Sequence, residues 1–81
     1  MNSVGYDKSK NFAKRVVRLY AYLRDSKHEY VMSKQLLRCG TAIGANLAEA
    51  KCSISRAEFL SKVYISLKET METLYWLRIA V

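Results

Sequence analysis

Three stretches of apolar residues at helical spacing run along this 81-residue chain, and no proline interrupts them. Only three glycines are present. Because proline and glycine are the residues that most often break helices, the pattern predicts long α-helices joined by few turns. We expect an all-α protein, an antiparallel up-and-down helical bundle, with three long helices over about residues 8–25, 27–51 and 56–81 of a single domain, 1–81.

The first predicted helix has an apolar face and a basic outer face. Its apolar residues recur at i, i+4, i+7, i+8 and i+11, namely Phe12, Val16, Leu19, Tyr20 and Leu23. Residues 1–28 carry seven basic and two acidic side chains, the largest excess in a chain of net charge +7. Such a helix attracts polyanions such as RNA, although a solvated face that only keeps the protein soluble fits the same pattern. The candidate RNA contacts are Lys8, Lys10, Lys14, Arg15 and Arg18.

The second predicted helix carries few charges and is expected at the centre of the assembly. Ser26 and Glu29 have the spacing of a capping box, which places the helix start at about residue 27. A helix that is apolar on most sides is buried on most sides. Its apolar ridge consists of Met32, Leu36, Ile43, Leu47 and Ala50.

Two further features of this helix indicate contacts with other helices. Small residues recur every fourth position, where they allow close packing of a neighbouring helix or are simply tolerated: Gly40, Gly44 and Ala48. Polar residues share a second side, and they predict an interhelix or intersubunit polar network or a ligand contact: Gln35, Arg38, Asn46 and Glu49.

The third predicted helix starts at a second capping box, formed by Ser55 and Glu58, with Ile54 and Phe59 placed for a hydrophobic staple. Its expected core face is Phe59, Val63, Leu67, Thr70, Leu74, Leu77 and Val81, widened by Leu60, Tyr64 and Met71. Trp76 and Ile65 lie on the side of this helix opposite the expected core face, and they indicate either a second contact surface or partly covered surface residues.

The sequence offers little chemistry for catalysis or metal binding. His28, Cys39 and Cys52 lack the spacing of a zinc site, and no phosphate-binding loop is present. We therefore expect no catalytic residues, no metal, no cofactor and no small-molecule substrate. Two cysteines without a secretion signal favour a cytoplasmic protein, and no apolar run approaches the roughly 20 residues that cross a membrane.

Two segments resemble a known family. Residues 35–50 read QLLRCGTAIGANLAEA, and residues 59–63, 67–69, 72 and 75–77 continue the likeness, so that it covers about residues 12–77. They are similar to the bacterial four helix bundle proteins, a family that includes proteins encoded in intervening sequences of large-subunit rRNA genes. This family is related to the accessory variability proteins of diversity-generating retroelements.

The resemblance implies an antiparallel four-helix bundle that assembles as a homopentamer. It implies association with RNA, a reverse transcriptase or a ribonucleoprotein for some relatives. By position, Gln35, Arg38, Asn46 and Glu49 match the family's recurrent polar residues, and Trp76 matches its recurrent aromatic residue. The family's fourth helix would follow Val81 and is missing from this sequence. Without it, we expect an apolar groove along Leu60, Leu67 and Leu74.

Three functional hypotheses follow. The first is a non-enzymatic, self-associating scaffold or accessory protein that engages RNA or a ribonucleoprotein through its basic first helix. The second is a protein–protein interaction module without a nucleic-acid role. A third and weaker hypothesis is an enzyme with a site shared between subunits, built from Arg38, Asn46 and Glu49.

Overall fold

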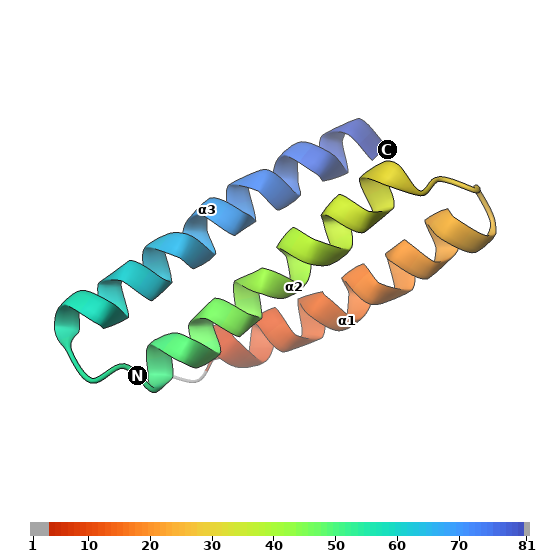
Figure 1. The fold of residues 1–81 in the computed structure, drawn as a ribbon. Coiled ribbons are helices and arrows are strands. Elements are labelled where there is room, and N and C mark those ends of the chain that lie inside the picture. The colour runs from red at the N-terminus through yellow and green to blue at the C-terminus, as the bar shows by residue number, and fades with distance from the viewer. Residues whose placement is uncertain (1–3, 81) are drawn as a thin grey trace.

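The structure is a computed structural model that describes residues 4–80 of the chain. It contains three α-helices, α1 (Val4–Asp25), α2 (Val31–Lys51) and α3 (Arg56–Ala80), which run antiparallel to their neighbours in sequence (Figure 1). The all-α, up-and-down bundle expected from the sequence is thereby confirmed. Among residues 4–80, we find no helix with the length and apolar character that crossing a membrane requires.

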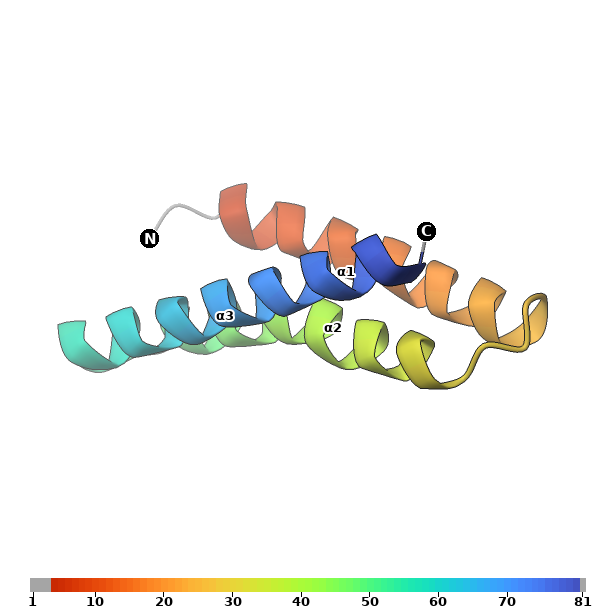
Figure 2. The same ribbon diagram turned by 90° about the horizontal axis from the view of Figure 1, so that it is seen from above.

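Helix α2 is the central element, as the sequence predicted. It packs on α1 along one side and on α3 along another, whereas α1 and α3 do not pack on each other within the described range (Figures 1 and 2). The result is an elongated body of 44 × 18 × 15 Å. Its buried apolar side chains are those of Val16, Leu23, Leu36, Cys39 and Ala50.

Helix α1 begins at Val4, four residues before the predicted start. The extra turn is supported by contacts with α2, since Lys51 Nζ lies 4.6 Å from the ring centroid of Tyr6 and the Ser9 side chain is buried. The sequence did not predict this extra turn, because the apolar residues at helical spacing begin only at Phe12.

The predicted start of the second helix at residue 27 is wrong. The helix begins at Val31, because His28 adopts a left-handed backbone conformation with φ of 54° that an α-helix does not accommodate. The expected capping box at Ser26 and Glu29 is therefore not the one that forms. Instead, the Glu29 carboxylate itself accepts hydrogen bonds from the backbone N–H groups of the first turn, those of Val31, Met32 and Ser33, at 2.7–3.0 Å.

The start of α3 agrees with the sequence prediction. Ser55 Oγ accepts a hydrogen bond of 3.0 Å from the Glu58 N–H, which is the N-cap half of the predicted box. The hydrophobic staple is wrong, because Ile54 is 94% exposed. The predicted end of this helix at Val81 lies outside the described residues.

The predicted core face of α3 is wrong in part. Phe59, Val63, Thr70 and Leu77 are half-buried, but Leu67 and Leu74 are exposed, as are Leu60, Tyr64 and Met71, which were expected to widen this face. Ser66 and Thr73 are instead buried on the side that meets α2. Helix α3 is apolar on most of its circumference, so spacing alone does not show which side faces α2. Hydrogen bonding contributes to that choice, since Ser66 Oγ donates to the Ile43 carbonyl across the interface at 3.0 Å.

Candidate functional site

The five basic residues predicted to bind RNA are all exposed, and at 3.6 residues per turn they lie within an arc of about 160° around α1. Lys8 and Arg15 border a groove that opens between α1 and α3. Lys10 instead lies against Tyr6, with Nζ 5.6 Å from the ring centroid. Lys14 and Arg18 are exposed and border neither of the hollows described below. The basic charge of α1 therefore covers one broad side of the helix, and Lys8 and Arg15 form the edge of that side next to the groove.

A basic residue that the sequence did not single out joins this set. Lys51, at the end of α2, places Nζ 4.6 Å from the Tyr6 ring that Lys10 also approaches. Two ammonium groups from different helices thus lie near one aromatic ring, an arrangement in which the ring quadrupole attracts each cation. No local sequence signal predicts this cluster, because residues 6 and 51 meet only when α1 packs on α2.

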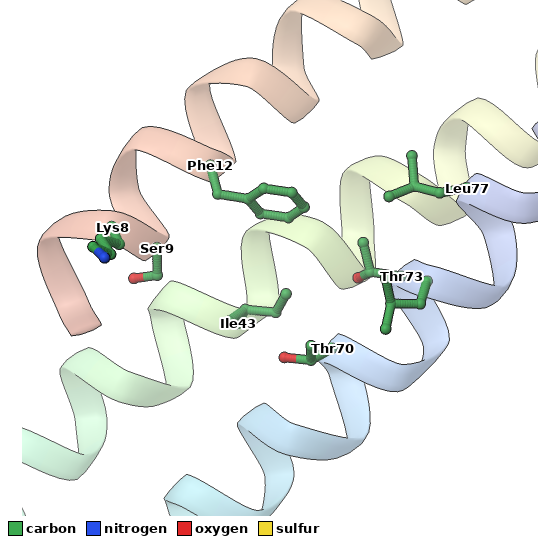
Figure 3. Close-up of a pocket in the computed structure, with 8 residues that line it drawn as sticks. Lys8, Ser9, Phe12, Ile43, Thr70, Thr73 and Leu77 are labelled. Atoms are coloured by element: carbon green, nitrogen blue, oxygen red, sulfur yellow. The ribbon is translucent and has the colours of Figure 1, made fainter. Parts of the chain in front are cut away.

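The groove between α1 and α3 is mostly apolar and has α2 as its floor (Figure 3). It contains a hollow of about 310 Å³ lined by residues of all three helices: Lys8, Ser9, Phe12, Ile43, Thr70, Thr73, Leu74 and Leu77. A second hollow of about 380 Å³ is lined by Phe12, Arg15, Val16, Leu19 and Leu77. Of the three leucines expected to line a groove, only Leu74 lines one of these hollows.

Helix α3 exposes a second apolar area on the side turned away from α2. Its large side chains are between 42% and 62% exposed, and they are Leu60, Tyr64, Leu67, Met71, Leu74 and Tyr75. A contiguous exposed apolar surface of this kind marks sites where proteins meet partners.

The polar residues of α2 divide into separate contacts with α3. The Arg38 guanidinium forms ion pairs with Glu69, at 3.3 Å, and with Glu72. At the other end of the interface, Glu49 pairs with Lys62 at 3.3 Å. Asn46 donates to the Ala42 carbonyl of its own helix at 2.9 Å, and Gln35 accepts from Arg38 at 3.5 Å. The four side chains therefore form two separate interhelix contacts, at Arg38 and at Glu49, and two hydrogen bonds within α2.

The hydrogen bond to Glu72 raises the pKa of the Arg38 guanidinium further above its ordinary value. Glu72 also accepts a hydrogen bond of 3.2 Å from the indole nitrogen of Trp76. Trp76 is half-buried and meets the ring of Tyr75 edge-on, with centroids 5.1 Å apart, and Ile65 is likewise half-buried. Trp76 is thus anchored within the α2–α3 contact, while Tyr75 beside it is exposed.

Two of the small residues of α2, Gly40 and Gly44, lie at the contact with α1. A Cβ atom placed on Gly40 would lie 2.9 Å from Val16 Cγ1, and one on Gly44 would lie 3.0 Å from Ser9 Oγ. Both distances are shorter than ordinary van der Waals contact, so the glycines permit the approach of α1. Ala48 is half-buried.

The described residues 4–80 contain no group of three His, Cys, Asp or Glu side chains that could hold a metal ion. Cys39 and Cys52 are both free thiols, the first buried and the second exposed. Arg38, Asn46 and Glu49 line neither of the two hollows. Arg38 and Glu49 form ion pairs with α3, and Asn46 donates a hydrogen bond to a carbonyl of its own helix.

Comparison with known proteins places this arrangement in a family. The family model described as 23S rRNA-intervening sequence protein matches residues 1–81, the whole chain. Among solved structures, a protein of unknown function from the S23 ribosomal protein family of Bacteroides thetaiotaomicron superposes with a TM-score of 0.94 and is 53% identical. The match covers 95% of this chain and 69% of that one. A search of curated proteins gives no significant match.

Proposed function

The chain belongs to the 23S rRNA-intervening sequence protein family, and from this premise we propose that it is a non-enzymatic cytoplasmic accessory protein. In this proposal it self-associates through its helices and engages RNA or a ribonucleoprotein through the basic helix α1.

The observation that carries the proposal is the apolar surface that α3 leaves exposed. Seven large apolar side chains of α3 are at least 42% exposed. Association with another molecule is a common way to bury an exposed apolar surface. Self-association therefore offers a physical reason for a surface that would otherwise be costly to expose.

The RNA part of the proposal rests on charge. Lys14 and Arg18 are exposed on α1, and the chain carries a net charge of +7. Lysine and arginine side chains bind the phosphate backbone without reading sequence, and they would position an RNA along the helix. The family description refers to an intervening sequence of 23S rRNA, which makes a structured RNA the probe to choose.

The test is the binding of a fluorescent structured RNA, followed by anisotropy at several salt concentrations. We expect affinity to fall steeply with salt and to be lost in the variant Lys14→Glu, Arg15→Glu, Arg18→Glu. The matched control is Lys34→Glu, Arg56→Glu, Arg78→Glu, which makes the same change in net charge at exposed residues outside α1. Equal binding by the two variants would show that α1 is not the contact.

A second candidate, a protein-interaction module without a nucleic-acid role, is favoured by the groove between α1 and α3. Its apolar lining is typical of a site for a protein partner, and there the positive charge of Lys8 and Arg15 would be incidental. An absence of RNA binding at about 50 mM salt, in a protein that still self-associates, would select this candidate.

A further inference from the structure

Helix α1 carries a row of residues at every fourth position that begins and ends with tyrosine and is basic in between. We call this set the basic row, and its members are Tyr6, Lys10, Lys14, Arg18 and Tyr22. Residues four apart are neighbours on a helix, and at 1.5 Å per residue the row is about 24 Å long. Its three basic side chains are exposed, and the Tyr22 side chain is 51% exposed. Each member is displaced by about 40° from the one before, so the row crosses α1 obliquely.

The packing of α1 on α2 extends the basic row onto a second helix at its Tyr6 end. Ser9 Oγ donates a hydrogen bond of 2.6 Å to the Tyr6 carbonyl, and this serine is buried where Gly44 leaves space for it. The contact holds Tyr6 beside the end of α2, where Lys51 Nζ lies 4.6 Å from the ring centroid. Lys51 therefore adds a cation from α2 to the row.

The cations along this path keep most of their charge available to a ligand. Among residues 4–80, the ion pairs include neither Lys51 nor any member of the basic row. Glu49, the acidic residue nearest to Lys51 in the sequence, is engaged by Lys62 at 3.3 Å. Asp7 is the acidic residue in the first turn of α1, and its single charge is outnumbered by the cations of the path. The surface is therefore net positive and attracts a polyanion.

The tyrosines supply aromatic rings beside the charge. Lys27 Nζ lies 5.9 Å from the Tyr22 ring centroid, and Lys10 and Lys51 both approach the ring of Tyr6. Cations next to an exposed ring are typical of surfaces that bind an unpaired strand, because the phosphates meet the cations while a base stacks on the ring. The bases of a duplex are already stacked on one another, so a duplex cannot use the ring in this way.

We propose that a single strand of RNA lies along the basic row. Its phosphates contact the cations of the row and Lys51, and one base stacks on the exposed ring of Tyr22. Tyr6 is half-buried, so its ring orders Lys10 and Lys51 instead of receiving a base. The inference rests on the RNA binding in the proposed function, and it names the form of the RNA and its path across α1 onto α2.

The first experiment compares two labelled RNAs by fluorescence anisotropy. One is a single strand of about ten nucleotides without self-complementarity, which is long enough to span the row, and the other is the duplex of the same length. Electrostatic attraction alone favours the duplex, because its charge density is higher. We expect the single strand to bind more tightly, and Tyr22→Leu should weaken its binding about tenfold while leaving the duplex unchanged.

The matched control for this variant is Tyr64→Leu. Tyr64 is 62% exposed on α3, and Lys68 Nζ lies 5.9 Å from its ring centroid, the same distance as for Lys27 and Tyr22. The change removes an equivalent tyrosine beside an equivalent lysine away from the row. It should leave the affinity for both RNAs unchanged.

The second experiment tests the step from α1 onto α2. Lys51→Gln removes one phosphate contact, so the slope of log affinity against log salt for the single strand should become shallower by about 0.7. Lys34→Gln makes the same change at another exposed position of α2 and should leave the slope unaltered. A purely structural role of Lys51 would change the thermal stability of the chain and leave this slope as it is.

The outcomes separate the basic row from the wider proposal. Failure of the unchanged chain to bind either RNA would overturn both the row and the RNA-binding part of the proposed function. Equal or tighter binding of the duplex, or an unchanged affinity in Tyr22→Leu, would overturn the single-stranded path and leave RNA binding in place. An unchanged salt slope in Lys51→Gln would overturn the extension of the path onto α2.

Discussion

Helix α2 contacts its two neighbours in different ways. Against α1 it presents glycine, and the backbones approach so closely that a Cβ at Gly40 would lie 2.9 Å from Val16 Cγ1. Against α3 it presents polar groups, with a hydrogen bond from Ser66 Oγ to the Ile43 carbonyl and ion pairs from Arg38 and Glu49.

This difference teaches how one helix selects two partners. Close packing against glycine depends on shape and leaves no space for a larger side chain. The polar contacts are partly solvated, so each should contribute little to stability, yet together they select one rotation of a helix that is apolar on most sides. Substitutions at the α1–α2 contact should therefore cost more than substitutions at the α2–α3 contact.

The largest effect is expected for Gly40→Leu. The new side chain would overlap Val16, whose branched side chain has few alternative rotamers, and we expect the free energy of unfolding to fall by about 3 kcal/mol. Urea unfolding followed by circular dichroism measures this change. Gly5→Leu is the control, because nothing lies within 4 Å of a Cβ at that position. Equal stability of the two variants would contradict the close packing of α1 on α2.

A smaller effect is expected for Ser66→Ala at the α2–α3 contact. The change removes the hydrogen bond to the Ile43 carbonyl and should lower the free energy of unfolding by about 1 kcal/mol relative to Ser61→Ala. Both substitutions lie in α3 and gain the same helix propensity, so their difference isolates the buried hydrogen bond. A loss as large as that of Gly40→Leu would remove the distinction between the two interfaces.

Arg38→Met should cost less still, about 0.5–1 kcal/mol, because the Arg38 side chain is half exposed and surface ion pairs are weak. The same change frees Glu72, the hydrogen-bond partner of Trp76, so the fluorescence of the only tryptophan should shift. Lys34→Met, at an exposed position of the same helix, should alter neither quantity. An unchanged Trp76 spectrum in Arg38→Met would show that the cluster is not formed in solution.

The smallest effect concerns Glu29 in the loop between α1 and α2, whose contribution to stability is present near neutral pH and is lost in acid. Hydrogen bonds from the N–H groups of Met32, Ser33 and Val31 hold the pKa of Glu29 below its ordinary value of 4.5. Glu29 therefore stabilises the fold above its unfolded-state pKa, and this contribution is lost as the pH falls through the lower folded-state pKa. Thermal unfolding between pH 3 and pH 6 should show a shallower pH dependence in Glu29→Gln than in the unchanged chain. Parallel curves for the two proteins would exclude Glu29 as the cap of α2.

The sequence predicted the number and order of the helices better than it predicted the start of α2 and the contacts between helices. The Ser55 cap fixed the start of α3 because the hydrogen bond involved is local, between residues three apart. The start of α2 was missed because Ser26 and Glu29 match a capping box by spacing, whereas the backbone at His28 turns left-handed between them.

The candidate site shows the same difference between what local spacing predicts and what contacts between helices decide. Lys8, Lys10 and Arg15 were named from the sequence, but the groove that Lys8 and Arg15 border and the position of Lys51 beside Tyr6 depend on how the helices pack.

By itself the sequence determined that the chain forms three long helices, that the second is central and that Gly40 and Gly44 share one side of it, because these properties follow from spacing along a single helix. Only the tertiary structure decided which side of α3 meets α2. Helix α3 carries apolar residues around most of its circumference, so its spacing fits several rotations, and contacts between helices distinguish them. The hydrogen bond from Ser66 and the ion pairs of Arg38 and Glu49 form in one rotation, and that rotation leaves Leu60, Leu67 and Leu74 exposed.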